Sequence, residues 1–157
     1  MASNGAKNFL QQVLNIVTKE GGFDRCISQM RIVSAEKGRC VAEVKLEKEH
    51  ANRSGAMHGG YTATLVDAVT TLALLTVNQE TPGVSVDLNV SYMKAAKTGD
   101  EILINAELLK SGKTLAFLSA DIVNKETGAL IARGSHTKDF GVIIRRSKKT
   151  CISEWKM

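Results

Sequence analysis

The chain has 157 residues, of which 43% are hydrophobic and 24% are charged. This length and balance are typical of a single globular domain that buries a core without needing disulfides or metals. The three cysteines lie far apart with no CxxC pair, which argues against a disulfide framework and favours a reducing compartment. We therefore expect a cytoplasmic protein, with mitochondria as the alternative location.

The net charge of +5 is concentrated near the C-terminus. Residues 142–157 contain five basic side chains against one acidic side chain, so residues 1–141 are close to neutral. Because aromatic residues make up only 4% and no zinc-finger spacing is present, no nucleic-acid partner is expected. We predict one folded domain over residues 1–141 and a solvated basic tail over residues 142–157.

An amphipathic helix is predicted near the N-terminus, over residues 8–20. Apolar side chains recur there at helical spacing, so we expect this face to dock on the domain. A pair of glycines at 21–22 ends the pattern. Two strands are predicted next, over residues 30–35 and 39–46, and the second alternates apolar with charged side chains.

A nearly all-apolar helix is predicted over residues 59–77. It follows a polar, glycine-rich loop at residues 52–58 and contains one carboxylate, Asp67. A membrane span is not expected, because the run is short and a central Asp costs roughly 2.5–3.5 kcal/mol on insertion. A helix that is apolar all round is instead expected where a sheet wraps it on several sides.

Strand patterns dominate the remainder of the domain. Alternating apolar and polar residues predict four strands, over 84–91, 102–108, 115–123 and 129–136. Short connections between the last three predict hairpins and therefore antiparallel pairing. The complete order predicts an α+β fold, in which a curved antiparallel sheet wraps around one long central helix.

Gly59 and Asp67 are the two groups of this central helix with a chemical interpretation. The Gly59 N–H at the helix start is free to bind a negatively charged oxygen, and Asp67 is a base that apolar neighbours should partly desolvate. The eight positions between them correspond to about 12 Å along the helix axis. One substrate carbonyl cannot touch both groups of one helix, so joint action predicts a two-fold dimer in which each subunit supplies one group.

The order of the motifs resembles that of a known family. The loop motif consists of Asn52, Gly55, His58, Gly59 and Gly60, and Asp67 lies on the helix that follows. This pattern is similar to the hotdog-fold acyl-CoA thioesterases of the phenylacetyl-CoA and 4-hydroxybenzoyl-CoA type. Further matches are found at residues 65–67, 83–87, 110–117 and 136–138, so that the similarity spans roughly residues 8–141. The resemblance implies hydrolysis of medium- to long-chain fatty acyl-CoA by a homodimer, usually paired into a homotetramer.

The residues predicted to form the catalytic centre are Asp67, Gly59, Asn52, His58 and Ser85. The Gly59 N–H would hold the oxyanion, while Asp67 would activate water or attack as a nucleophile. By the resemblance, Ser85 would orient the water. Asn52 would bind the thioester, and His58 would position Asn52 or assist the leaving thiolate. Structural roles stay open: the glycine pair would then only cap the helix, and Asp67 would only pair with a lysine.

The phosphates of CoA call for cations and free amides. The residues predicted to contact CoA are Tyr92, Lys94, Lys110, Ser111, Gly112, Lys113, Thr114, Leu115, His136 and Lys138. No metal site is expected, because the three histidines are widely spaced and no paired-ligand motif is present. No cofactor is expected beyond the CoA of the substrate.

Two other functions are compatible with the same pattern. A hotdog hydratase or dehydratase would need a His–Asp or His–Glu pair, but His58 and Asp67 lie on different turns of the predicted helix. A non-catalytic acyl-CoA binding module would use the tail as a partner contact, but it has little reason to desolvate a carboxylate beside a thioester. Hydrolysis therefore remains the leading hypothesis.

Overall fold

The structure, a computed structural model, describes residues 2–79 and 81–141. The basic tail predicted over residues 142–157 lies outside this range. The helices are α1 (Ala2–Lys19), η1 (Phe23–Ile27), η2 (Lys48–His50) and α2 (Gly59–Leu75). The strands are β1 (Arg31–Glu36), β2 (Arg39–Lys45), β3 (Val84–Tyr92), β4 (Glu101–Ser111), β5 (Leu115–Asn124) and β6 (Leu130–Asp139).

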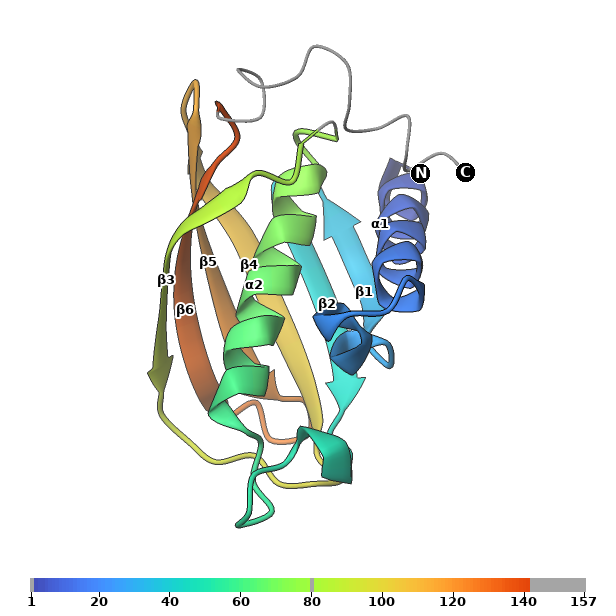
Figure 1. The fold of residues 1–157 in the computed structure, drawn as a ribbon, viewed down its shortest axis with the longest axis vertical. Coiled ribbons are helices and arrows are strands. Elements are labelled where there is room, and N and C mark those ends of the chain that lie inside the picture. The colour runs from blue at the N-terminus through green and yellow to red at the C-terminus, as the bar shows by residue number, and fades with distance from the viewer. Residues whose placement is uncertain (1, 80, 142–157) are drawn as a thin grey trace.

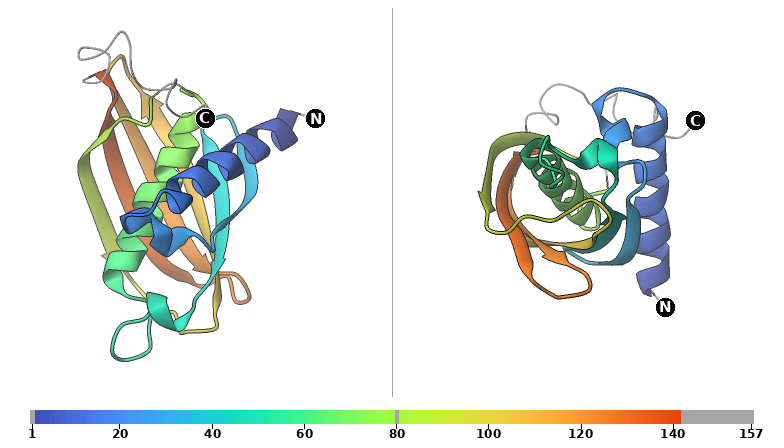
Figure 2. Two further views of the ribbon diagram at one scale, coloured as in Figure 1. Left: turned by 45° about the vertical axis from the view of Figure 1, so that its right-hand side comes forward. Right: turned by 90° about the horizontal axis from the view of Figure 1, so that it is seen from below.

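The strands form one sheet in the order β1-β2-β4-β5-β6-β3, and every neighbouring pair is antiparallel. The sheet curves around α2, as the views in Figures 1 and 2 show. This arrangement confirms the α+β fold predicted from the sequence. No helix in the described part of the chain is long and apolar enough to cross a membrane.

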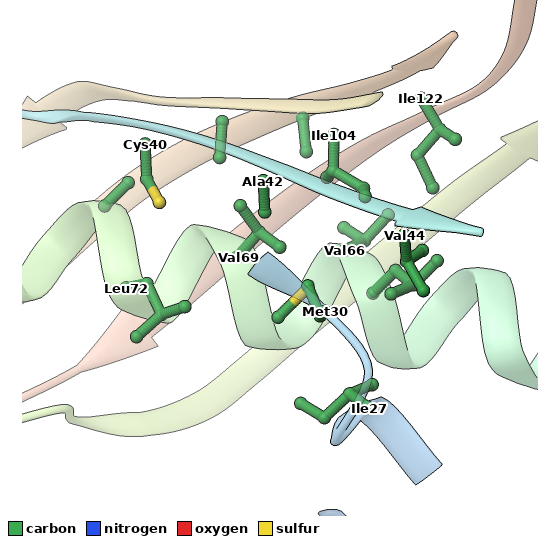
Figure 3. Packing of buried hydrophobic residues seen from close by; sticks show 14 of the residues in the cluster. Ile27, Met30, Cys40, Ala42, Val44, Val66, Val69, Leu72, Ile104 and Ile122 are labelled. Carbon is green, nitrogen blue, oxygen red and sulfur yellow. The ribbon is translucent and has the colours of Figure 1, made fainter. Parts of the chain in front are cut away.

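The core lies between α2 and the concave face of the sheet. Val66 and Val69 of α2 lie on the side of the helix that faces Ala42 and Val44 of β2 (Figure 3), and all four side chains are buried. A helix enclosed in this way needs apolar residues on most of its circumference, which explains the absence of a polar face in its sequence.

The two edges of the sheet are treated differently. α1 lies beside β1 (Figure 2), and the Gln11 side-chain oxygen accepts a hydrogen bond from the Ile32 backbone N–H at 2.8 Å. No described element pairs with the outer edge of β3, where Val84 and Val86 are 46% and 60% exposed. One edge is therefore covered by the chain itself, and the other is free.

Two strands differ from their predicted form in ways that affect the site. β6 continues to Asp139, beyond the predicted end at 136, because Leu115 at the start of β5 pairs with Asp139. β3 contains a bulge at Val86, since its pairing with β6 shifts between Ser85 and Asp87. Both features decide which side chains face α2.

Candidate active site

The N-terminus of α2 carries an unpaired backbone donor. His58 caps the helix, with its Nδ1 accepting a hydrogen bond from the Gly60 N–H at 2.9 Å. In the neutral imidazole the proton is therefore on Nε2. The Gly59 N–H has no acceptor among the described residues, and it points out of the positive end of the helix dipole. This end of α2 is suited to binding a negatively charged oxygen.

Asn52 organises the loop that leads to the helix. Its side-chain oxygen accepts hydrogen bonds from Ser54 N at 2.9 Å, from Ser54 Oγ at 2.7 Å and from Ala56 N at 3.2 Å. This oxygen is committed to the turn, so only the side-chain amide is left to donate to a ligand. No hydrogen bond joins His58 to Asn52 in the described structure, and the predicted positioning of Asn52 by His58 stays a prediction.

Tyr92 and Lys94 lie at the same end of the molecule as Gly59. The Tyr92 hydroxyl donates to the Gly59 carbonyl oxygen at 3.1 Å. Both residues line a pocket of about 320 Å³ that also includes Asn52 and Met93. Residues predicted separately for catalysis and for CoA binding are thus brought to one pocket.

Asp67 lies near the middle of α2, in the wall of a second pocket of about 360 Å³. The lining is mostly apolar and comes from α1, η1, α2 and the segment leading through β3. It includes Val13, Phe23, Leu72, Pro82 and Leu88. The Asp67 side chain is 48% exposed. In the single subunit it is therefore half-buried and accessible to a ligand.

Ser85 faces α2 because of the bulge at Val86. A regular alternation would put Ser85 on the same side as Asp87, but Ser85 pairs with the buried Lys138, whereas Asp87 pairs with Thr137. Cross-strand partners share a face of the sheet. The bulge therefore turns the Ser85 hydroxyl toward the helix.

A hydrogen-bonded chain links Ser85 to α2 through His136. When Thr70 Oγ1 donates to the Val66 carbonyl at 2.7 Å, its oxygen accepts from His136 Nδ1, which also lies at 2.7 Å, whereas the other tautomer of His136 would reverse both ring hydrogen bonds. In neutral His136 the other nitrogen, Nε2, is then an acceptor, and the Ser85 hydroxyl donates to it at 2.9 Å. The lone pairs of Ser85 Oγ are left free for another donor.

His136 is neutral at ordinary pH. Burial lowers its pKa from 6.5 to about 4, and the nearby Lys138 acts in the same direction, against the opposing effects of Asp67 and Asp87. The side chain is 1% exposed. The proton assignment in the Ser85 chain therefore holds well below neutral pH.

Lys138 is the cation of this cluster. It is 4% exposed, its Nζ donates to Thr71 Oγ1 at 2.7 Å, and it lies 3.9 Å from Asp67 Oδ1. Burial lowers its pKa, and the Asp67 carboxylate opposes this effect. His136 and Lys138 were both predicted to contact CoA. That contact stays a prediction, while their burial favours a role beside Asp67.

The remaining residues of the CoA prediction lie on the β4–β5 hairpin. The Gly112 N–H donates to the Leu115 carbonyl at 2.8 Å and closes the turn, and Lys110 and Lys113 are exposed. Figure 1 shows this hairpin at the opposite end of the sheet from the start of α2. Within one subunit, the hairpin and Gly59 are therefore far apart.

The site thus consists of two groups of residues on one subunit. Asp67, Ser85, His136 and Lys138 form one group, and Gly59 with its neighbours lies about two helical turns away. Sequence reasoning missed Thr70 and Thr71. Their positions three and four residues after Asp67 place them on the same helix face, a spacing that contained the necessary signal. No cluster of three or more His, Cys, Asp or Glu side chains able to hold a metal occurs in the described ranges.

Comparison with known proteins identifies the family. Residues 54–131 match the model described as Thioesterase superfamily. Acyl-coenzyme A thioesterase 13 of Mus musculus is 50% identical over 132 residues, which cover 84% of this chain and 94% of that protein. The chain belongs to the thioesterase superfamily.

Solved structures of family members support the fold. Zebra fish thioesterase superfamily member 2 has a TM-score of 0.84 at 48% identity, covering 86% of this chain and 98% of that chain. A hypothetical thioesterase from Streptococcus pneumoniae TIGR4, solved with coenzyme A, has a TM-score of 0.66 at 28% identity and covers 70% and 84% respectively. The predicted hotdog fold and the predicted resemblance to acyl-CoA thioesterases are both confirmed.

Proposed function

We propose that the chain hydrolyses acyl-CoA thioesters to a free acid and CoA, with medium- to long-chain fatty acyl groups as substrates. The observation that carries this proposal is the half-exposed carboxylate of Asp67 in the wall of a mostly apolar pocket of about 360 Å³. A pocket of this size and lining suits a lipid-like acyl group. The activity in the name of the Mus musculus relative supports the same substrate class.

In the proposed reaction, Asp67 takes one proton from a water molecule as its oxygen attacks the thioester carbonyl carbon. With its own proton directed at His136, Ser85 accepts a hydrogen bond from the second O–H of this water, which stays on the attacking oxygen, and so orients the attacking lone pair. The carbonyl oxygen becomes an oxyanion, which a Gly59 N–H stabilises. Collapse of the intermediate breaks the C–S bond, and CoA leaves as a thiolate that takes the proton from Asp67. Each step uses protein groups and water alone.

His58 and Asn52 have supporting roles in the proposed reaction. The His58 imidazole carries its proton on Nε2 beside Gly59, so it is placed to donate to the leaving sulfur. The Asn52 amide is left to bind the carbonyl. We prefer Asp67 as a base over Asp67 as a nucleophile, because a polarised hydroxyl such as that of Ser85 is of use only where a water is held.

The reaction as written requires two subunits. Gly59 and Asp67 lie about 12 Å apart along one helix, beyond the reach of one carbonyl. We propose that two copies pair through the free edge of β3, where Val84 and Val86 are exposed, so that antiparallel α2 helices bring the partner's Gly59 toward Asp67. Further pairing into a homotetramer is proposed from the family resemblance, and sedimentation would distinguish the two assemblies.

CoA is proposed to contact the exposed residues of the predicted set. These are Tyr92, Lys94, Lys110, Ser111, Gly112, Lys113, Thr114 and Leu115. The proposed two-fold pairing through β3 would put the β4–β5 hairpin of one subunit near the Gly59 end of the other and so bring these residues to one ligand. Lysines on exposed turns supply the charge that phosphates require.

A hotdog hydratase or dehydratase would need a His–Asp or His–Glu pair, and in the structure His136 lies beside Asp67, a pair that the sequence did not reveal. Its Nε2 lies 3.8 Å from Asp67 Oδ1. Both ring nitrogens are engaged, by Thr70 and by Ser85, and the ring is buried. It is therefore shielded from a substrate proton next to the thioester carbonyl, and the geometry favours activation of water.

A reducing compartment, the cytoplasm or mitochondria, is proposed as the place of action. Cys26 and Cys40 are free thiols in the described structure. Burial raises the pKa of Cys40 to about 12, so this thiol serves as an inert part of the core.

Thiol release from acyl-CoAs of graded chain length tests the proposal. We expect turnover by the wild type and a fall in kcat of at least about 100-fold for Asp67→Asn, since the amide cannot take a proton from water. Circular dichroism and sedimentation would check that the variant keeps its fold and assembly. Undiminished turnover by Asp67→Asn would remove Asp67 from the mechanism, and no turnover on any acyl-CoA would favour the binding module.

A further inference from the structure

Lys138 is a buried lysine beside the carboxylate of the proposed thioesterase site. Lys138 is 4% exposed, although an ammonium group is costly to bury. The groups near it are Thr71 and Asp67 of α2 and the neutral His136 on its own strand. Asp67 is the only carboxylate within ion-pair distance of it in the described structure.

Lys138 and its neighbours lie near one oxygen of Asp67, Oδ1. Lys138 Nζ is 3.9 Å and His136 Nε2 is 3.8 Å from Oδ1, which is the nearer carboxylate oxygen in both pairs. Thr71 Oγ1 lies 3.5 Å from the same atom. The second oxygen, Oδ2, is therefore farther from these groups.

Thr71 connects the lysine to the helix. Its hydroxyl donates to the Asp67 backbone carbonyl at 2.8 Å, so the hydroxyl oxygen is free to accept from Lys138 Nζ at 2.7 Å. An ammonium group with three donors is held by this bond on a strand of the sheet, 3.9 Å from Asp67 Oδ1. Asp67 thus lies beside a fixed cation in the wall of the pocket.

We propose that Lys138 is a positioning residue for hydrolysis: anchored by Thr71, it acts through its charge to hold Asp67 as an oriented carboxylate beside the attacking water. This inference rests on the function proposed above. In this role Lys138 does not touch the substrate, in contrast to the contact with CoA that was predicted for it from the sequence. The other charged groups near this cluster are Asp24 of η1, in the wall of the same pocket, and Asp87 of β3, which acts on His136 from the other face of the sheet; both are acidic, so no second cation substitutes for Lys138 in the described structure.

The test compares two thioesters that share one acyl group, an acyl-CoA and the corresponding acyl-N-acetylcysteamine, which lacks phosphates. For Lys138→Met, which keeps the apolar stem, we expect kcat to fall about 10- to 100-fold on both substrates with KM changed less than about threefold. Lys37→Met, in the exposed β1–β2 turn, is the matched control and should match the wild type. Thermal unfolding would check that each variant folds.

A second variant separates positioning from packing. Thr71→Val removes the hydroxyl that accepts from Lys138 with little change in volume, and its effect should not add to that of Lys138→Met in the double variant. A loss confined to KM on acyl-CoA would overturn the inference in favour of a phosphate contact. Unchanged kcat in Lys138→Met, in an enzyme that Asp67→Asn inactivates, would overturn the inference but leave the proposed function intact. A wild type inactive on both thioesters would refute the proposed function itself.

Discussion

A side chain at Gly59 is expected to affect the proposed chemistry more than the stability of the fold. A Cβ added there would lie 3.5 Å from the Tyr92 ring, an ordinary contact that the structure accommodates. We therefore expect Gly59→Ala to leave the free energy of unfolding nearly unchanged, while its methyl group obstructs the thioester. The fall in kcat/KM should be about tenfold or more, judged by the cost of disturbing an oxyanion donor. Full activity of a folded Gly59→Ala would show that the carbonyl does not approach this amide.

His136 predicts how stability changes with pH. Its pKa in the folded protein is about 4, below the ordinary 6.5, so between these values the unfolded chain binds more protons. Stability should therefore rise with pH through this window and be lost as pH falls, by roughly 1–3 kcal/mol in total. Urea unfolding of the wild type and of His136→Gln at pH 7 and pH 4.5 checks this. Equal acid destabilisation in both would assign the effect to other groups.

The residues of the site were predictable to different degrees. Asp67 and Gly59 stand out because a carboxylate in an apolar helix and a glycine at a helix start are unusual in their local sequence. The environment of Ser85 was not predictable, since it depends on a one-residue bulge that reverses the alternation of β3. The burial of Lys138 was also hidden, because a lysine near the end of a strand is usually solvated.

At the level of elements, the packing of α2 on β6 depends on Gly134. A Cβ at this position would overlap the Val66 side chain, so the helix and strand would have to move apart. We expect Gly134→Ala to lower the free energy of unfolding by about 1–3 kcal/mol. Chemical denaturation measures this, and Gly128→Ala would not be a suitable control because its φ is positive. Gly5→Ala, with open space around it, is the better comparison, and equal stability of the two variants would contradict the tight packing.

Most of the helices and strands were predictable from the sequence. Period-two alternation gave all the strands of the sheet, and an apolar run gave α2, because each reflects burial on a particular face. The extension of β6 to Asp139 depends on its pairing with β5, and the start of α1 at Ala2 lies in a stretch with little apolar pattern. Such boundaries are set by tertiary contacts that local patterns do not contain.

At the scale of the whole molecule, the proposed division of the site between two subunits can be tested by mixing variants. An Asp67→Asn subunit still provides Gly59, and a Gly59→Ala subunit still provides Asp67. In a mixed dimer one site then contains both intact groups, while the other lacks both. When the two variants are refolded together, we expect activity above that of either variant alone, up to half of the wild-type kcat per mixed dimer.

The control for this experiment is the mixture of the two variants without refolding. It should keep the low activity of the separate variants until subunits exchange, and mass spectrometry of differently tagged subunits would count the mixed dimers. Absence of recovery in a confirmed mixed dimer would place both groups in one subunit and contradict the shared site.

The unequal edges of the sheet limit how far copies of this chain can associate. A subunit that joins another through β3 buries the sheet edge that is open in the described part of the chain, while α1 and the Gln11 side chain cover the β1 edge. Growth by strand addition therefore terminates after one step and cannot propagate into a fibril. The N-terminal helix α1 thus protects the β1 edge from strand pairing. Its removal would leave a β3-paired dimer with an exposed β1 edge at each end, to which further copies could add.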